Sequence, residues 1–414
     1  MPGGTGRADL NHKTKNTGTP LVSLLTLLLV AINLRPAITA IGPVMPMIGA
    51  DLGLGPSSLG ILGALPLACF GLVSFAVQPL MARFGVERTT AGALAVLTVA
   101  TVWRSWPGPE ANLWLGTVLV GSSIAVGNVT VPVLVKQRFP KSTALITSIY
   151  VAVLGLFAGL AAALAVPLAD GSPLGWRLSL GAWALLTLVA TAFWLHRAHH
   201  TARPPTGRTA PGPAAAAAAA PIWRSRLAWQ LSLYMGLQSS VFYVALTWLP
   251  SVEQALSVAL ATAGWHMLLL QVAGTVGNLV APVLMRAGGD QRLAATLPGA
   301  AALLAVGGIY LAPAWVGLWV LVLGLATGTT FVVALSLMAL RAGDLAAAGK
   351  LSAMSQSVGY GLAALILWGA GALQALGPLG PLAVLALTSV GVILSGLPVG
   401  RGKALAPAPD RSQG

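Results

Sequence analysis

Arg35 is the residue with the strongest chemical signal, because a permanent charge stands in the middle of a long apolar run. Its guanidinium holds five N–H donors in a planar fork, which suits a planar anion or a ring with acceptor atoms. Pro36 removes a backbone donor and disfavours helical geometry at Arg35, so the sequence predicts a kink there. The alternative is a structural arginine that donates to backbone carbonyls of neighbouring helices. A binding role is favoured, since no acidic residue is expected at the same depth.

Other polar side chains inside the apolar runs are candidates for the same binding site. Gln238 lies 203 residues after Arg35, which is also the spacing of an internal repeat described below, so we expect it to complete the site. Gln356 and Tyr360 are four residues apart and therefore share one face of a helix. The remaining candidates are Asn33, Thr39, Asn128, Tyr150, Tyr243 and Gln271. Hydrogen bonding between helices is the alternative interpretation for each, because amides and hydroxyls often join helices in membranes.

His266 is the candidate for proton chemistry. Membrane proteins that move protons commonly use Asp, Glu or His inside the membrane. We expect every acidic residue to lie in a tail or loop, which leaves His266 alone in this role; the nine are Asp9, Asp51, Glu87, Glu110, Asp170, Glu253, Asp290, Asp344 and Asp410. A hydrogen-bonded interfacial residue is the favoured interpretation of His266, and proton coupling is the alternative.

Arg104 is expected to snorkel to the interface beside Trp103 and Trp106.

The elements that must position these side chains are membrane helices. Of the 414 residues 56% are hydrophobic and 8% are charged, whereas soluble proteins carry about 25% charged residues. This composition excludes a soluble enzyme or a free nucleic-acid-binding protein, and the single Cys69 excludes a disulfide framework or a multi-cysteine metal site. A bilayer needs about 20 apolar residues per helix. On that basis twelve spans are predicted near 21–47, 57–82, 89–106, 113–135, 143–166, 176–195, 227–249, 259–285, 293–312, 314–340, 350–373 and 380–399.

The chain is thus predicted to be an all-α membrane protein of two six-helix bundles. The bundles are residues 21–195 and 227–399; a tail over 1–20, a linker over 196–226 and a tail over 400–414 complete the chain. Of the 23 basic residues, all except Arg35, Arg104 and Arg177 then fall on the side of the tails and linker. Basic residues favour the cytoplasmic side, so both termini are expected in the cytoplasm of a cell whose inner, or plasma, membrane holds the protein.

An internal repeat relates the two bundles. A shift of 203 residues superposes the turn after the second span on the turn after the eighth, with Pro79 on Pro282. It also superposes Arg83, Gly85 and Glu87 on Arg286, Gly288 and Asp290. Two parallel six-helix halves are the pattern of major facilitator transporters. The turns resemble that family's cytoplasmic signature, and this resemblance implies a gating role. Gln78 and Ala82 stand in place of the signature's first Gly and its Asp. A solvated basic turn is the alternative interpretation.

Several local sequences resemble the cyanate/nitroimidazole branch of the major facilitator superfamily, over about residues 21–399. They are N-L-R-P-A-I-T-A-I-G-P at 33–43, K-Q-R-F-P at 136–140, G-L-Q-S-S-V-F-Y at 236–243, T-W-L-P at 247–250 and L-S-A-M-S-Q-S-V-G-Y-G at 351–361. The resemblance implies a secondary transporter of small, compact solutes, such as cyanate-like anions or nitroimidazoles, working by alternating access. The alternatives are a multidrug-type exporter with a largely apolar cavity and a transporter-like membrane sensor.

The partners expected from this interpretation are few. They are a small-molecule or small-anion substrate, membrane lipid and a proton as the coupling ion. No nucleic acid, cofactor, metal or enzymatic activity is expected. The protein is expected to be monomeric, with the binding site between its two halves near Arg35.

Overall fold

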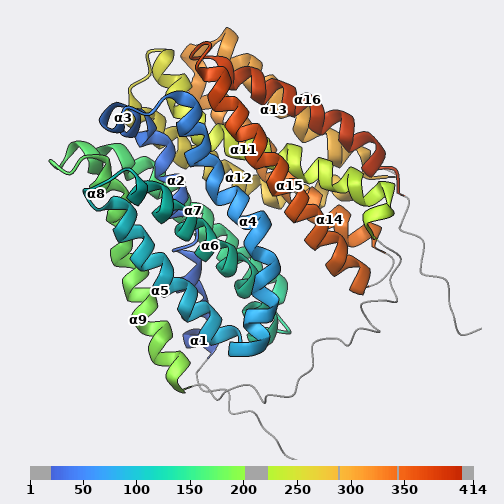
Figure 1. Ribbon diagram of the computed structural model, residues 1–414. Helices are drawn as coiled ribbons and strands as arrows, with labels where there is room; N and C mark the ends of the chain where they lie inside the picture. The colour runs from blue at the N-terminus through green and yellow to red at the C-terminus, as the bar shows by residue number, and fades with distance from the viewer. Residues whose placement is uncertain (1–19, 201–221, 288–289, 343–344, 403–414) are drawn as a thin grey trace, which may run out of the picture.

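The computed structural model describes residues 20–200, 222–287, 290–342 and 345–402, and over these residues every regular element is a helix (Figure 1). The first half contains α1 (Pro20–Ala31), α2 (Pro36–Thr39), α3 (Ile41–Leu52), α4 (Pro56–Phe84), α5 (Val86–Ser105), α6 (Ala111–Arg138), α7 (Thr143–Asp170), α8 (Trp176–Gly181) and α9 (Trp183–His200). The second contains η1 (Ile222–Arg224), α11 (Arg226–Ala255), α12 (Leu260–Arg286), α13 (Arg292–Leu311), η2 (Pro313–Trp315), α14 (Val316–Arg341), α15 (Leu345–Gln374) and α16 (Gly380–Val399). The expected all-α fold is confirmed. The inner part of the predicted linker and most of both predicted tails lie outside the described residues.

Two of the twelve expected spans are broken helices. The first is interrupted between α1 and α2, where Arg35 adopts φ −122° and ψ −37° before Pro36 begins the next turn. This confirms the expected kink, since proline disfavours helical geometry in the residue before it. The sixth span is divided at Ala182 into α8 and α9, which the sequence did not predict.

Ten helical stretches of the described chain are long and apolar enough to cross a membrane. The third and seventh expected spans, α5 and α11, are more polar than the others. For α11 the reason lies in its packing: its polar residues, from Ser232 to Glu253, are buried against other helices. A helix that contacts protein on most sides does not need a lipid-like sequence.

The two halves meet mainly through α3 with α11, α4 with α15, and α7 with α12, and α3 also contacts α12. Glycines make these contacts close. A Cβ added to Gly42 would lie 2.4 Å from the Leu246 carbonyl oxygen, and one added to Gly60 would lie 3.0 Å from that of Trp368. Gly155 and Gly159, which are four residues apart on α7, pack against α12 in the same way: a Cβ on Gly159 would lie 2.5 Å from Leu268 Cδ1. Small residues let membrane helices approach closely.

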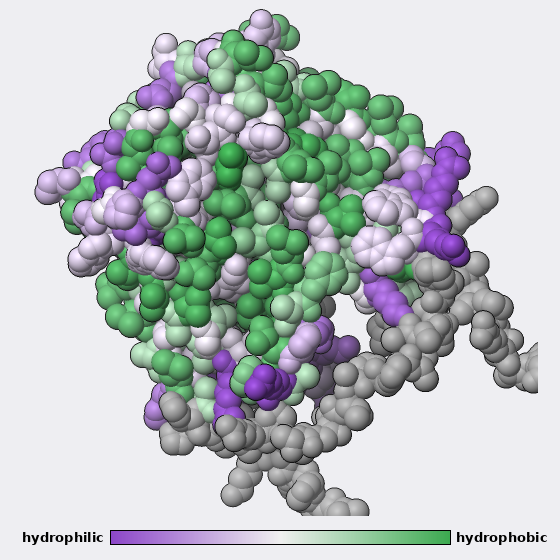
Figure 2. Space-filling model, viewed as in Figure 1, coloured by the Kyte–Doolittle hydropathy of each residue, from purple (hydrophilic) through white to green (hydrophobic). Residues whose placement is uncertain are grey.

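These contacts gather toward one end of the molecule. We call the end with the turns after α4, α6 and α12 the basic end, and the other the opposite end. The close glycine contacts between the halves lie in the middle of the helices or nearer the opposite end, as for Gly42, Gly60 and Gly264. Toward the basic end the bundles diverge (Figure 1), and the surface is hollowed between them (Figure 2). The structure is therefore closed at the opposite end.

Candidate functional site

Arg35 joins the two halves where they meet. Its Nη1 donates to the hydroxyl of Tyr243 on α11 over 2.8 Å. Arg35 itself lies in the break between α1 and α2. The partner is thus a side chain of the other half, not a backbone carbonyl of the same bundle. Arg35 is only half-buried, which leaves part of its donor fork accessible.

Aromatic rings surround this guanidinium. Its Cζ lies 5.9 Å from the ring centroid of Phe242 and 5.8 Å from that of Tyr243. Edge-to-face contacts continue the cluster from Tyr243 to Tyr360 on α15, at 6.4 Å, and from Tyr360 to Phe70 on α4, at 5.7 Å. Aromatic faces attract a cation through their quadrupole within about 6 Å. The cluster therefore stabilises the charge while leaving its net value at +1.

No carboxylate of the described chain forms an ion pair with Arg35. A buried charge without a counter-charge is costly, and an anionic or acceptor-rich ligand lowers that cost. The flat rings around the guanidinium also suit a flat ligand, which can stack on them. The arrangement can therefore bind a small planar anion or a polar heteroaromatic ring.

Two predicted binding residues next to Arg35 make bonds within the protein. The Asn33 side-chain amide donates to the Leu29 carbonyl at 2.7 Å, which satisfies an acceptor left free at the end of α1. The buried Thr39 hydroxyl contacts two carbonyl oxygens, that of Arg35 at 3.2 Å and that of Ala158 on α7 at 2.8 Å. Both residues therefore hold the break in place around Arg35.

The amides predicted to line the site have other surroundings. Gln238 is buried and donates within α11, to the Met235 carbonyl at 3.2 Å and to Ser239 Oγ at 2.8 Å. The bond of Arg35 across the halves goes to Tyr243 instead. Gln356 donates to Ser352 Oγ on its own helix at 2.9 Å, and Gln271 is buried where α12 meets α7.

Asn128 on α6 and Tyr150 on α7 are partly buried. Of the predicted binding residues, the structure therefore brings Arg35, Tyr243 and Tyr360 together. Phe70 and Phe242 belong to the same cluster and were not predicted. A phenylalanine in an apolar helix resembles any lipid-facing residue, so the sequence carries no signal for Phe70. Phe242 precedes Tyr243 in the segment at 236–243 that resembles the cyanate/nitroimidazole branch, and this position was the only indication that it belongs to the site.

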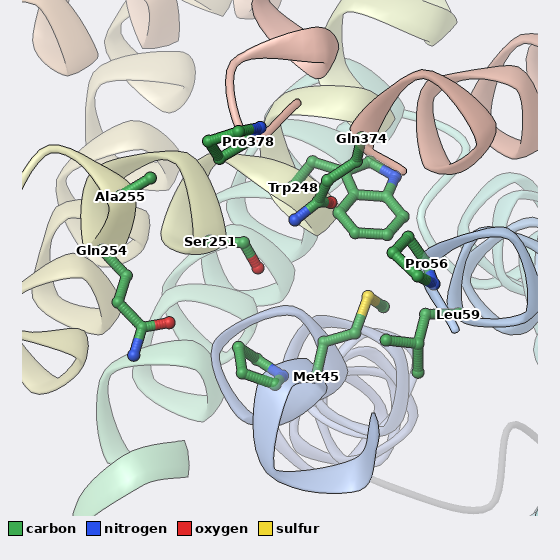
Figure 3. A pocket seen from close by; sticks show the side chains of 10 residues that line it. Met45, Pro56, Leu59, Trp248, Ser251, Gln254, Ala255, Gln374 and Pro378 are labelled. Atoms are coloured by element: carbon green, nitrogen blue, oxygen red, sulfur yellow. The ribbon is translucent and has the colours of Figure 1, made fainter. Parts of the chain in front are cut away.

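A pocket lies beyond the closed contact, at the opposite end (Figure 3). It has a volume of about 340 Å³ and is lined by Met45, Pro46, Pro56, Leu59, Trp248, Ser251, Gln254, Ala255, Gln374 and Pro378. Trp248 is five residues beyond Tyr243 on α11, or about 7.5 Å along the axis. Gly42 and Gly63 pack against Leu246 and Thr247 between these levels, so this packed layer separates the pocket from Arg35.

The predicted gating turns make their strongest bonds within one half. Glu87 pairs with Arg138 of α6 at 2.5 Å and with Arg197 of α9 at 3.4 Å, after a turn in which Gly85 has φ +83°. Arg83 lies over the neighbouring Phe84 ring, with 5.3 Å from Cζ to the centroid. The first turn therefore ties three helices of the N-terminal half together.

The matching turn in the other half is similar but not identical. Asp290 pairs with Arg292 at 3.1 Å, and Arg341, the repeat partner of Arg138, donates to Gln291 Oε1 at 2.6 Å. Arg286 is exposed at the end of α12. Gly288 lies outside the described residues.

Glu253 corrects an expectation of the sequence. It was expected in a loop, but it lies within α11, is 0% exposed, and meets His266 of α12 with 2.5 Å between Oε2 and Nδ1. Its other carboxylate oxygen, Oε1, has no hydrogen-bond partner among the described residues. His266 is therefore not alone: it is half of a carboxylate–imidazole pair. The missed signal is the length of α11, which at 30 residues extends past the predicted span.

Comparison with known proteins agrees with this architecture. Residues 27–367 match the model of the Major Facilitator Superfamily. The chain is 36% identical over 344 residues to the Uncharacterized transporter YycB of Bacillus subtilis (strain 168), covering 82% of this chain and 83% of that protein. It is 35% identical over 346 residues to the 2-nitroimidazole transporter of Escherichia coli (strain K12), covering 83% and 86%.

A more distant relative and a solved structure extend the comparison. The Cyanate transport protein CynX of Escherichia coli (strain K12) is 28% identical over 355 residues, covering 85% of this chain and 90% of that protein. The crystal structure of a D-xylose-proton symporter has the same fold, with a TM-score of 0.71 at 14% identity, covering 93% of this chain and 99% of that one. These relatives are membrane transporters and not enzymes, as expected. The chain is a member of the major facilitator superfamily.

Proposed function

We propose that the protein is a secondary transporter that moves a small, compact solute by alternating access, with Arg35 as its central binding residue. The solute is a cyanate-like anion or a nitroimidazole-like heterocycle. One observation carries the proposal: where the two halves meet, a half-buried guanidinium with no carboxylate partner among the described residues lies beside the rings of Phe242 and Tyr243. These rings continue the aromatic cluster to Tyr360 and Phe70. The relatives named for 2-nitroimidazole and cyanate support this class of solute.

The ligand chemistry follows from the donors and the rings. Cyanate and the nitro group each offer acceptor atoms to a fork of N–H donors. A nitroimidazole ring can in addition stack on Tyr243, Tyr360 or Phe242, and its nitro group can replace the Tyr243 hydroxyl as a partner of Arg35. Phe70, Phe242 and the two tyrosines would equally suit a larger apolar compound, and this supports the multidrug-type exporter as the second candidate.

Alternating access is supported by the asymmetry of the contacts between the halves. The close contacts lie from the middle of the helices to the opposite end, and the bundles diverge at the basic end. We infer that the basic end faces the cytoplasm, because basic loops favour that side of a plasma membrane. The structure is then open to the cytoplasm, and the pocket beside Trp248 is the mouth on the outer side. The protein works as a monomer embedded in lipid.

Proton coupling is assigned to the pair formed by Glu253 and His266. A buried carboxylate and an imidazole at 2.5 Å can share a proton, and intramembrane pairs of this kind mark proton pathways. Gly317 of α14 packs close to the free imidazole nitrogen, since a Cβ there would lie 3.4 Å from Nε2.

The helices α3, α7 and α13 pack on α12 and carry other titratable groups at this end. Asp51 is already paired with Arg177 at 2.6 Å, Asp170 ends α7, and Tyr310 is exposed on α13. The first turn of α14 and the ends of α15 and α16 that adjoin α11 carry no titratable residue.

Flux into liposomes tests the function. Purified protein is reconstituted, and uptake of labelled cyanate and 2-nitroimidazole is measured against protein-free liposomes. Saturable flux of either solute is the expected result. Binding without flux would instead favour a membrane sensor, and flux of large apolar cations alone would favour the multidrug-type exporter.

A further inference from the structure

Arg104, in the last turn of α5, has an environment opposite to the one its sequence suggests. It was expected to snorkel, but it is 1% exposed, whereas its neighbours Trp103 and Trp106 face outward. None of its three side-chain nitrogens has a hydrogen-bond partner in the described part of the chain. No carboxylate of that part forms an ion pair with it either. Arg104 is therefore a buried, uncompensated cation.

Such a cation needs a partner. A guanidinium stays charged at any physiological pH, so Arg104 cannot become neutral to escape the cost of burial. A buried charge is retained in proteins when it is paired and hydrogen-bonded. A buried polar group that no protein atom satisfies indicates a bound ion or water.

Arg177 on α8 also has a buried Nε without a partner, but its Nη1 is paired with Asp51. Three neutral polar groups with buried, unpartnered atoms lie on the helices packed around the same end of α5. They are Thr117 Oγ1 on α6, Ser179 Oγ on α8 and Trp183 Nε1 on α9. The helices approach closely here, because a Cβ on Gly116 would lie 2.3 Å from that of Arg104, and one on Gly181 would lie 3.2 Å from that of Ser105.

The two hydroxyls differ from others on neighbouring turns. Thr98, Thr101 and Ser105 of α5 each donate to the carbonyl four residues earlier, at 2.7–2.9 Å. Thr117 and Ser179 make no such bond, so their protons are free to point elsewhere. Together with the indole N–H of Trp183, the two hydroxyls provide three neutral donors beside the cationic guanidinium of Arg104.

We propose that this cluster, Arg104, Thr117, Ser179 and Trp183, binds a small monovalent anion of halide size, such as chloride. Every member can donate, and Arg104 supplies the compensating charge. The close approach of α5 to α6 and α8 favours a monatomic ion over an organic one. The site lies within the N-terminal half and joins α5, α6, α8 and α9, so it is separate from the site at Arg35 and does not depend on the proposed transport.

Thermal unfolding of purified protein tests the proposal. The melting temperature is measured while chloride replaces gluconate at constant ionic strength, and again with bromide. Because the ion binds the folded state, the melting temperature should rise and then increase linearly with the logarithm of halide concentration. Crystals grown in bromide should show anomalous scattering beside Arg104. If the melting temperature is unchanged by both halides and no anomalous peak is seen, water fills the cluster and the proposal is overturned.

Variants localise the effect. Arg104→Met should abolish the halide response, whereas Arg177→Met, which removes an arginine at the same end that is already paired with Asp51, should keep it. An equal response in Arg104→Met would refute the assignment. If that variant does not fold, Thr117→Val and Ser179→Ala serve instead. Each should raise the half-saturating halide concentration about tenfold, since a hydrogen bond to a charged group is lost; unchanged midpoints would contradict the proposal.

Discussion

Replacing Arg35 with Gln removes the half-buried charge that joins the two halves through Tyr243 at 2.8 Å. A hydrogen bond to a charged group contributes about 1.5–3 kcal/mol, and the fork can offer two to one planar ligand. Gln retains one donor group and recovers part of this, so we expect a loss of about 2–4 kcal/mol in ligand binding. That corresponds to affinity about 30- to 700-fold weaker.

Two smaller changes separate charge, geometry and orientation. Arg35→Lys keeps the charge but loses the planar fork, and an intermediate loss of about 1–2 kcal/mol is expected. Tyr243→Phe keeps the ring 5.8 Å from the guanidinium and removes only the hydroxyl that orients it, at a cost of about 1 kcal/mol. Tyr360→Phe is the matched control, because its ring contacts are retained and no hydroxyl bond to Arg35 is lost.

The assay is a titration of folded protein with 2-nitroimidazole or cyanate, followed by calorimetry, with the melting temperature of each variant recorded in parallel. A structural arginine would lower yield and melting temperature together with affinity, whereas a binding arginine lowers affinity alone. Full affinity in a well-folded Arg35→Gln variant would refute the reasoning and move the site elsewhere.

Three further predictions concern the gate, the coupling and the orientation. Gly371→Val should open the end beside Trp248, because a Cβ at Gly371 would lie 2.6 Å from the Pro56 carbonyl oxygen. In this variant, Ser251→Cys should be labelled faster by a thiol reagent. Gly369→Val is the control and should have no effect, because a Cβ at Gly369 meets open space. Glu253→Gln should flatten the pH dependence of flux while solute exchange persists, and Asp170→Asn should not; an unchanged profile would exclude the pair from coupling. Arg224→Cys should resist an impermeant reagent in intact cells, and strong labelling from outside would reverse the proposed topology.

Composition and the length of the apolar runs were enough to predict the helical fold, because apolar length is a property of single segments. The kink at Arg35 was also predictable, since Pro36 acts on its immediate neighbour. The pairing of Arg35 was not. Repeat symmetry favoured Gln238, but that amide bonds within α11, five residues before the tyrosine that Arg35 contacts. Sequence symmetry gives the register of helices and leaves open which side chains meet across an interface.

Burial of charge was the other property that the sequence did not reveal. Arg104 and Glu253 both lie near predicted helix ends, where a charge usually reaches water. Both are buried because a third or fourth helix packs over the end: α6 and α8 approach the end of α5, and α12 meets α11 at His266. Single-segment patterns contain no information about such neighbours, which explains why these residues were placed in the wrong environment.

The distribution of bonds favours motion of the halves as rigid bodies. Ion pairs such as Glu87–Arg138, Asp51–Arg177 and Glu253–His266 each join helices of one half. Across the halves many of the close contacts instead involve a glycine, as for Gly42 against the backbone of Leu246, and such contacts can part without leaving a buried charge unpaired. Arg35 bonds across this same interface. In the alternating access that we propose, a ligand that competes for the donors of Arg35 would act directly on a contact that has to break. A binding site placed there would therefore bias the equilibrium between the two proposed open states, as population shift requires.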